Sequence, residues 1–463
     1  MLSAAAVTAL PAQTFKTLHS FDNTDGAFPY WAPLQATDGN LYGTTPFGGI
    51  NGYGTIFRIT PSGTLTTLYT FCSQRDCLDG GAPEAGLVQA ADGDFYGVAA
   101  GGGADGYGTV FKFTLSGKLT TIHNFQETDG SGPYTALIQA TDGNFYGTTC
   151  CGGANGFGTV FKMTPGGRLT TLHSFDNFTD GGYPYAGLLQ ASDGNLYGAT
   201  ASGGPNEAGT IFKISPTGTF ATLYFFCSQN NCTDGASPYG ALVQAPNGSF
   251  YGTTYYGGAY NSGTVFKFTL SGMLTTLHNF CSQSGCADGQ WPEAPLVQAT
   301  DGNFYGTSRF GGASDSGTVF KVSPTGKLTS LYSFCSQSGC SDGAYPYAGL
   351  IQDTNGKFYG TACGTSCGGQ GNGYGTVYSE SVGLGPFVET EPTSGTVGAP
   401  VKILGSNLMG ATSVTFNGVA AVFKVVSSSF ITTSVPTGAT SGKVKVTLPS
   451  GTLTSNLPFR VRP

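Results

Sequence analysis

The sequence repeats one unit seven times, and this repeat constrains the fold more strongly than any other feature. The motif LVQATDGNFYGT marks the copies, and successive Tyr-Gly pairs lie 50 to 54 residues apart. Each unit contains four short apolar runs, separated in order by a turn, a Gly-Gly loop and a second turn. A period of this length is typical of propellers and solenoids. The Tyr-Gly pairs begin at Tyr42, Tyr96, Tyr146, Tyr197, Tyr251, Tyr305 and Tyr359.

The turns and the composition favour short antiparallel strands. Asp-Gly and Asn-Gly between two strand-like runs are strong hairpin signals, because both central residues must accept positive φ. The chain has 75 glycines and 13% aromatic residues but only 10% charged residues, which favours strands and tight turns. Four antiparallel strands per unit predict an all-β chain with a seven-bladed β-propeller. A β-solenoid is the alternative, although its coils are usually shorter and lack repeated hairpins.

The two ends of the repeat region predict how the propeller closes. The segment FKTLHSF at 15–21 reads as a fourth strand with no unit before it. The segment GTVYSES at 375–381 reads as a third strand with no fourth strand behind it. We therefore expect the N-terminal strand to complete the last blade, running antiparallel to 375–381. Closure of this kind removes the exposed edges that an open array would leave.

The repeat resembles a known family. The pattern DGNFYGTT…GG…GTVFKMTPGG…LTTLHSF is similar to the Gloeobacter/Verrucomicrobium-type (GloVer) tandem repeat of secreted bacterial proteins, over about residues 14–382. The resemblance implies an extracellular or cell-surface location, and it supplies no catalytic residues to transfer to this chain.

A second resemblance covers the C-terminal part. After Ser381 the repeat stops, and VGLGPFVETEP reads as a linker. The rest resembles an IPT/TIG domain in Ser394-Gly395 and in the segments at 403–408, 414–418 and 435–446. The resemblance implies an immunoglobulin-like β-sandwich, which completes the predicted domain order. The regions are 1–13 as a signal-peptide remnant or disordered tail, 14–382 as the propeller, and 383–463 as linker and IPT/TIG domain.

Charge and hydropathy exclude two kinds of partner. The formal net charge is −7, and the few Lys and Arg are dispersed rather than clustered, so we expect no nucleic-acid partner. The basic residues of the IPT/TIG region are also scattered, unlike those of the DNA-binding branch of that family. No apolar run approaches the roughly 18 residues of a membrane span, so we predict none.

The cysteines predict disulfides. Eight of the 12 form C-x4-C pairs, each just before the Asp-Gly of a loop between units. Neither the converging ligands of a zinc site nor a redox C-x-x-C at a helix start occurs, so we predict no metal and no cofactor. Paired cysteines indicate an oxidising compartment, and the pairing of Cys150, Cys151, Cys363 and Cys367 stays open. The predicted pairs are Cys72 with Cys77, Cys227 with Cys232, Cys281 with Cys286, and Cys335 with Cys340.

Three sets of polar residues recur at repeat positions, and we interpret each as structural. The four histidines share one position in the fourth strand with tyrosines, so they read as strand-face residues. The Asp before Gly in each inter-unit loop reads as a turn cap rather than a calcium ligand. The Gln of each first strand either lines a central channel or bonds between neighbouring blades, and we favour the second. The sets are His19, His123, His173 and His278; Asp25, Asp79, Asp129, Asp180, Asp234, Asp288 and Asp342; and Gln35, Gln89, Gln139, Gln190, Gln244, Gln298 and Gln352.

Positions where the repeat varies predict a binding face. After the loop proline, five units place Tyr and two place Glu. The inter-unit loops and the loops between second and third strands emerge on one face of a propeller, and that face also carries extra aromatic residues. Aromatic rings beside carboxylates suit stacking on sugars. The predicted ligand-binding residues are Tyr30, Trp31, Glu84, Tyr134, Tyr185, Tyr239, Tyr255, Tyr256, Glu293, Phe310 and Tyr347.

These observations favour a secreted or cell-surface protein without catalytic activity that binds or scaffolds through the variable face. A polysaccharide or another surface protein is the expected partner. The alternative is an extracellular carbohydrate-active enzyme, a glycosidase or lyase, with its site on the same face. Glu84 and Glu293 belong to nearly opposite units, which we expect to hold them further apart than the 5 to 10 Å or so of glycosidase carboxylates. We therefore assign no catalytic residue.

Overall fold

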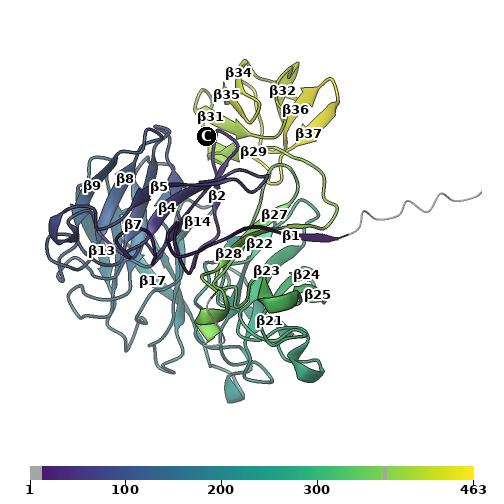
Figure 1. Ribbon diagram of the computed structural model, residues 1–463. Coiled ribbons are helices and arrows are strands. Elements are labelled where there is room, and N and C mark those ends of the chain that lie inside the picture. The colour runs from purple at the N-terminus through teal and green to yellow at the C-terminus, as the bar shows by residue number, and fades with distance from the viewer. Residues whose placement is uncertain (1–12, 369–372, 463) are drawn as a thin grey trace, which may run out of the picture.

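The computed structural model describes residues 13–368 and 373–462, and these residues form seven four-stranded antiparallel sheets and a C-terminal β domain. The predicted tail at 1–13 lies outside the described residues except for Gln13. The repeat region is β-propeller-like, with one sheet per repeat unit, and the C-terminal domain packs against one end of it (Figure 1).

Each sheet follows the same strand order along the chain. The first sheet contains β2 (Leu34–Gln35), β3 (Leu41–Thr45), β4 (Thr55–Ile59) and β5 (Leu65–Thr70). The second contains β6 (Val88–Gln89), β7 (Phe95–Ala99), β8 (Thr109–Phe113) and β9 (Leu119–Asn124). The third contains β10 (Ile138–Gln139), β11 (Phe145–Thr149), β12 (Thr159–Met163) and β13 (Leu169–Ser174). The fourth contains β14 (Leu189–Gln190), β15 (Leu196–Thr200), β16 (Thr210–Ile214) and β17 (Phe220–Phe225).

The remaining three sheets repeat this order. The fifth contains β18 (Val243–Gln244), β19 (Phe250–Thr254), β20 (Thr264–Phe268) and β21 (Leu274–Asn279). The sixth contains β22 (Val297–Gln298), β23 (Phe304–Ser308), β24 (Thr318–Val322) and β25 (Leu328–Ser333). The seventh contains β26 (Leu350–Gln352), β27 (Phe358–Ala362), β28 (Thr376–Ser381) and β1 (Thr14–Ser20). Short 3-10 helices lie in the loops: η1 (Arg75–Cys77), η2 (Asn230–Cys232), η3 (Ser284–Cys286), η4 (Ser338–Cys340) and η5 (Thr365–Gly368).

The N-terminal strand completes the seventh sheet, as the sequence predicts. β1 pairs antiparallel with β28, from Thr14 opposite Ser381 to Ser20 opposite Thr376, and Figure 1 shows the purple strand beside the green ones. Phe15 stacks on Tyr332 of the sixth sheet with ring centroids 3.7 Å apart. The strand therefore contributes a hydrogen-bonded ladder to the seventh sheet and an apolar contact to the neighbouring sixth sheet.

Apolar clusters join each sheet to the next and the seventh to the first. Among the described residues, seven such clusters each combine side chains of two successive sheets. The last of them places Tyr359 and Val377 of the seventh sheet against Leu41 and Phe57 of the first. The sheets therefore form a closed circle, in which apolar surface is buried at every junction.

Packing explains the Tyr-Gly pair of each unit. The second strand is buried on both faces, and a Cβ atom at Gly97 would lie 2.5 Å from Cζ of Phe111 on the adjacent strand. Only a residue without a side chain leaves room for that ring. The preceding turn is held by Asp92, which accepts a hydrogen bond from the Tyr96 hydroxyl at 2.9 Å and pairs with Lys112 at 2.8 Å.

The recurring Gln residues bond between sheets, which confirms the structural interpretation. The backbone N–H of Thr37 donates to Oε1 of Gln89 in the next sheet at 2.9 Å, and that of Thr354 donates to Gln35 across the closing junction. Oε1 of Gln298 is buried without a hydrogen-bond partner. The residue at the donor position of the fifth unit is Pro246, which has no N–H to give.

The C-terminal domain contains two four-stranded sheets packed around an apolar core. One sheet has the order β29 (Glu389–Glu391), β31 (Pro400–Leu404), β35 (Phe430–Ser434) and β34 (Phe423–Ser427). The other has β33 (Val419–Ala420), β32 (Ser413–Phe416), β36 (Val444–Leu448) and β37 (Gly451–Thr454). β30 (Ser394–Gly395) and β38 (Arg460–Val461) form a short parallel pair. Buried residues of both sheets, including Ile403, Phe416, Ile431 and Val446, fill the space between them.

This domain covers one mouth of the circle. Lys402 Nζ donates to the Ala90 carbonyl at 2.7 Å, and Ser429 Oγ donates to the Thr37 carbonyl at 2.8 Å. Further contacts reach three other sheets: Arg462 to Thr141, Arg460 to the Ser192 carbonyl, and Ser406 to Thr354. In Figure 1 the yellow domain lies above the sheets accordingly.

The structure joins all four C-x4-C pairs as disulfides: Cys72–Cys77, Cys227–Cys232, Cys281–Cys286 and Cys335–Cys340. It adds a fifth bridge, Cys363–Cys367, that sequence reasoning left open. Cys150 and Cys151 are unpaired, and Cys150 is buried.

Candidate binding site at the open mouth

A proline in each inter-unit loop fixes the residues that form the open mouth. Pro83 lies against the first sheet, where a Cβ at Gly54 would be 2.6 Å from Cδ of the proline. Pro292 and Gly263 form the equivalent contact between the fifth and sixth units. Because the proline is locked onto the preceding sheet, the residue after it, Glu84 or Glu293 here, is held just ahead of the first strand of its own sheet.

The seven post-proline residues converge on one cavity. It has a volume of about 370 Å³, and its wall is made by residues from all seven units. Eight of the 11 predicted ligand-binding residues line it: Tyr30, Trp31, Glu84, Tyr134, Tyr185, Tyr239, Glu293 and Tyr347. All eight side chains are half-buried, so each is held in place and still reaches the cavity.

The other three predicted residues lie behind or beside the cavity rather than in its wall. Tyr255 is buried and packs between Tyr239 and Trp291, with ring centroids 5.6 Å from each. Phe310 packs edge-on against Trp291. Tyr256 is 42% exposed and contacts the same tryptophan from outside. These rings support the wall of the cavity on its fifth and sixth units.

Neighbouring tyrosines contact one another around the mouth. The ring centroids of Tyr134 and Tyr185 are 5.7 Å apart, and Tyr185 and Tyr239 have the same separation. Tyr30 and Tyr347, which meet where the circle closes, are 5.1 Å apart. The aromatic wall is thus continuous across three successive units and again across the closing junction, which limits how far any ring moves.

Glu293 has a cationic partner inside the wall. Nη1 of Arg309 lies 3.4 Å from Oε1 of Glu293 and the same distance from the Tyr255 hydroxyl. The guanidinium also stacks over the ring of Tyr347, 4.1 Å from its centroid. Burial raises the pKa of the Glu293 carboxyl to about 7, although Arg309 opposes the shift. Oε2 of Glu293 is buried without a hydrogen-bond partner.

Glu84 occupies the same repeat position but has no such partner. Among the described residues no side chain or backbone group donates a hydrogen bond to its carboxyl group, and no cation pairs with it. Burial alone raises the pKa of Glu84 to about 7. Burial, with a smaller contribution from the charge of Glu84, raises the pKa of Tyr30, Tyr134 and Cys150.

Sequence reasoning missed Arg309 and Cys150, and a signal for both was present. Each follows directly after the second strand of its unit, where the other copies have Pro46, Ala100, Ala201, Tyr255 and Cys363. The residue at this position varies in size and charge among the seven units, and in the sixth unit it is Arg309, which pairs with Glu293 of the cavity wall. Attention to that position would have identified the partner of Glu293.

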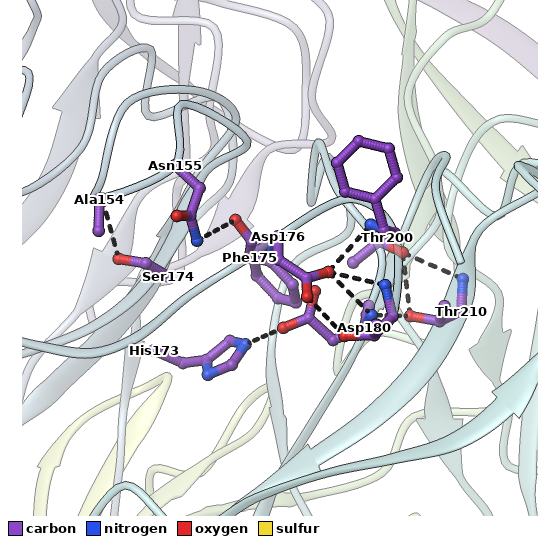
Figure 2. Close-up of polar contacts among 11 residues, drawn as sticks. Ala154, Asn155, His173, Ser174, Phe175, Asp176, Asp180, Thr200 and Thr210 are labelled. Atoms are coloured by element: carbon purple, nitrogen blue, oxygen red, sulfur yellow. Dashed lines mark hydrogen bonds and ion pairs between the residues drawn. The ribbon is translucent and has the colours of Figure 1, made fainter. Parts of the chain in front are cut away.

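The histidines and loop aspartates form structural pairs away from the cavity, which confirms their interpretation. Figure 2 shows Nε2 of His173 against Oδ2 of Asp180, 2.6 Å apart, while the N–H of Asp176 donates to the other oxygen of Asp180. The ring of His173 also stacks on Phe220, with centroids 3.7 Å apart. The other three histidines pair in the same way: His19 with Asp25, His123 with Asp129, and His278 with Asp288.

In units with tyrosine at this position, the aspartate is a satisfied buried turn cap. Asp79 is fully buried and accepts hydrogen bonds from the Tyr69 and Ser73 hydroxyls and from the N–H groups of Ser73 and Gln74. Burial opposes ionisation of Asp79, but the hydrogen bonds from Tyr69 and Ser73 outweigh it and lower the pKa of the carboxyl group. Within the described residues no group of three or more His, Cys, Asp or Glu side chains is placed to hold a metal ion.

The covered mouth contains a second cavity with a different lining. It has a volume of about 980 Å³ and lies between the second and third sheets and the C-terminal domain. Glu389 and Glu391 of β29 face it, together with Lys402. Burial, followed by the charges of Glu391 and Asp353, raises the pKa of Glu389 to about 8. The protein's own C-terminal domain forms one side of this cavity.

The fold and the repeat define a β-propeller-like repeat protein with a C-terminal β domain, and its sequence matches a known family. Residues 6–192, 72–232 and 227–403 match the Gloeobacter/Verrucomicrobia repeat. The matches span most of the chain, so the chain belongs to this family. Residues 388–461 match the IPT/TIG domain. No curated protein sequence matches the chain.

Solved structures are similar in fold. The extracellular domain of a proposed one-component system from B. thetaiotaomicron superposes over 98% of this chain and 58% of its own length, with a TM-score of 0.51 and 10% identity. A proposed 6-phosphogluconolactonase from Bacteroides uniformis covers 70% of this chain and 88% of its own length, with a TM-score of 0.48 and 18% identity. The first likeness supports the fold, and neither identifies a ligand. No helix among the described residues is long and apolar enough to cross a membrane.

Proposed function

We propose that this chain is a secreted or cell-surface binding protein that recognises carbohydrate at the open mouth of its circle of sheets. In this proposal residues 14–382 are a seven-bladed β-propeller closed by the N-terminal strand. Residues 383–463 are a linker and an immunoglobulin-like IPT/TIG sandwich. The observation that carries the proposal is the convergence of Tyr and Glu side chains from all seven units on one cavity.

The chemistry of the wall supports a sugar. Pyranose rings have apolar faces that stack on aromatic side chains and polar edges that need hydrogen-bond partners. Glu84 and Glu293, whose pKa values burial raises to about 7, supply both donors and acceptors near neutral pH. The five disulfides support an oxidising compartment, where extracellular proteins fold.

A second candidate is a carbohydrate-active enzyme, a glycosidase or lyase, that uses the same cavity. The observation that favours it is the pair of carboxyl groups with raised pKa in one cavity, because a general acid must carry its proton near the working pH. In this case Glu84 or Glu293 is the proton donor. Binding without turnover separates the first candidate from the second.

A glycan array on the full chain, followed by calorimetry with the best ligand, tests the proposal. Tyr134→Ala removes a ring from the cavity wall, and we expect it to weaken binding by about tenfold, equivalent to about 1.4 kcal/mol. Tyr260→Ala, which removes a ring that is 55% exposed and does not line the cavity, is the matched control and leaves affinity unchanged. Equal effects of the two substitutions, or no glycan bound, refute the proposed site.

A turnover assay on the ligand found by the array tests the enzymatic candidate. Reducing ends or unsaturated products that appear with the unmodified chain and disappear in Glu84→Gln or Glu293→Gln favour an enzyme. Full occupancy of the site with no product over a long incubation favours a binding protein.

A further inference from the structure

The two glutamates of the cavity wall differ in whether a cation of the protein pairs with the carboxyl group. Both follow a loop proline, and both side chains are buried enough that their pKa values rise to about 7. Glu293 is neutralised by Arg309 at 3.4 Å. Glu84 lacks a cation or hydrogen-bond donor among the described residues, so its negative charge has no counterpart in the protein.

We propose that the cavity binds a saccharide carrying a primary ammonium group, with Glu84 as the counter-charge and the tyrosine rings as an aromatic cage. This inference rests on the proposed carbohydrate recognition and names its substrate class. An ammonium group beside Glu84 forms the ion pair that Arg309 forms with Glu293, while the sugar ring stacks on the aromatic wall.

The aromatic wall itself favours a cation. The faces of tyrosine rings carry partial negative charge and attract ammonium and guanidinium groups, most strongly where water is excluded. The wall already holds one cation in this way, since the Arg309 guanidinium lies 4.1 Å from the centroid of Tyr347. Tyr30 and Tyr134, which belong to the units on either side of Glu84 and line the same cavity, are the rings available to a ligand cation there.

The charge of the cavity disfavours acidic sugars. With both carboxyl groups ionised, the lining residues and Arg309 have a net charge of −1, and the uncompensated charge is at Glu84. A carboxylate or sulfate on the ligand would repel it. A neutral sugar would leave the Glu84 charge buried without a partner, which costs free energy.

The ion pair makes binding depend on pH in a defined direction. The titratable groups that line the cavity with Glu84 are Glu293 and the phenols of Tyr30, Tyr134, Tyr185, Tyr239 and Tyr347. Arg309 pairs with Glu293, and the charge of Glu84 adds to the burial that raises the pKa of the Cys150 thiol. A cation binds the ionised carboxylate, so its affinity rises as pH increases towards the pKa of Glu84 at about 7. From pH 5.5 to pH 7 we expect a gain of roughly tenfold for a ligand whose ammonium group stays protonated, such as a lysine-containing peptide.

Calorimetry on the full chain with two oligosaccharides of equal length tests the inference. One is a fully deacetylated glucosamine oligomer, and the other is its N-acetylated counterpart, which has the same ring faces but no charge. We expect the deacetylated oligomer to bind at least about tenfold more tightly at pH 7. Glu84→Gln removes this preference, whereas Glu293→Gln, at the same repeat position, retains most of it. Both variants are first matched to the unmodified chain by thermal melting.

The outcomes separate this inference from the function on which it rests. Equal affinity for the two oligomers, or a preference that persists in Glu84→Gln, overturns the ammonium site while carbohydrate recognition stands. Failure of every glycan to bind overturns both. A third arm uses a short lysine-containing peptide, which carries the ammonium without the sugar. If the peptide binds as tightly as the oligomer, the cation site stands, but the inference that its ligand is a saccharide is overturned.

Discussion

The two mouths of the circle of sheets are built from the same repeat unit but carry different side chains. The first strand of each sheet runs from one mouth to the other: in the second unit Glu84 precedes β6 at the open mouth, and the turn at 91–93 follows it at the covered mouth. The covered mouth presents the same Asp-Gly or Asn-Gly turn in every unit. The open mouth presents residues that vary from unit to unit.

The covered mouth packs against the C-terminal domain, whereas the open mouth is the face where we propose that a ligand binds. At the covered mouth the C-terminal domain contacts turns of five sheets, largely through backbone carbonyls such as those of Thr37 and Ala90. Uniform turns suit such contacts. At the open mouth, tyrosines, a tryptophan and two glutamates line a cavity that the described residues leave open, and Arg309 pairs with one of the glutamates. Variation within a repeat therefore points to the face that meets another molecule.

The largest expected effect comes from opening the circle on which both mouths depend. Deletion of residues 1–21 removes β1, its ladder with β28 and the contact of Phe15 with Tyr332. Loss of the half-buried Phe15 and Leu18 and of the buried Phe21 costs on the order of 5 kcal/mol, so the melting temperature falls by on the order of 10 °C. Deletion of residues 1–12 is the control, and differential scanning calorimetry is the measurement. Identical melting of the two truncations contradicts the role of β1.

The next largest effect comes from the disulfides, which stabilise the loops of the sheets but not the contact with the C-terminal domain. Four disulfides lie in loops between successive sheets and the fifth between β27 and β28, whereas the covered mouth is held by hydrogen bonds to the C-terminal domain. Replacing Cys281 and Cys286 together with serine removes about 2 kcal/mol on the chain-entropy argument. We expect a lower melting temperature, while Cys150→Ser, which breaks no bridge, has a smaller effect.

Mass spectrometry after alkylation in denaturant without reductant checks the same bridges directly. We expect label on Cys150 and Cys151 alone. Label on any of the other ten cysteines in native protein contradicts the disulfide assignment.

A smaller effect concerns Glu389, which lines the cavity at the covered mouth. Its pKa is raised from 4.5 to about 8 by burial and by neighbouring carboxylates. Between these two values the folded protein binds more protons than the unfolded chain, so the free energy of unfolding decreases as pH rises from about 4.5 to about 8. Glu389→Gln removes this dependence, and we expect it to raise stability at pH 8 by about 1 kcal/mol relative to pH 5, after allowing for solvent in the cavity.

The control for this measurement is Glu207→Gln, which alters an exposed glutamate of the fourth unit. Thermal melting of both variants at pH 5 and pH 8 gives the comparison. If Glu389→Gln changes the melting temperature by the same amount at pH 5 and pH 8, the Glu389 carboxyl group does not destabilise the folded protein at the higher pH.

The smallest effect compares two glutamines that the repeat makes equivalent. Gln89 accepts a hydrogen bond from Thr37, whereas the matching oxygen of Gln298 has no donor because Pro246 occupies that position. Gln89→Met therefore loses a bond between sheets that Gln298→Met never had. We expect the first substitution to destabilise the protein by about 1 kcal/mol more than the second, as measured by denaturant unfolding. Equal losses contradict a stabilising role for this bond.

The sequence by itself determined the repeat number, the strand order, the closing strand and four disulfides. Each depends on a local signal: apolar runs with a fixed spacing, Asp-Gly turns, or two cysteines five positions apart, as in Cys72 and Cys77. The candidate wall of the open mouth was also predictable in part, because one repeat position carries Tyr or Glu in every unit. These features follow from short-range geometry, which adjacent residues specify.

Only the tertiary structure decided which of those residues have partners. Arg309 meets Glu293 from a different loop of the same unit, Pro246 deprives Gln298 of a donor across a sheet junction, and Ser429 reaches Thr37 over a separation of 392 residues. Such contacts depend on how whole sheets and domains pack against one another, and no short segment encodes them. The sequence could therefore place Glu84 and Glu293 at equivalent positions, but only packing shows that one carboxyl group is neutralised and the other faces the cavity without a partner.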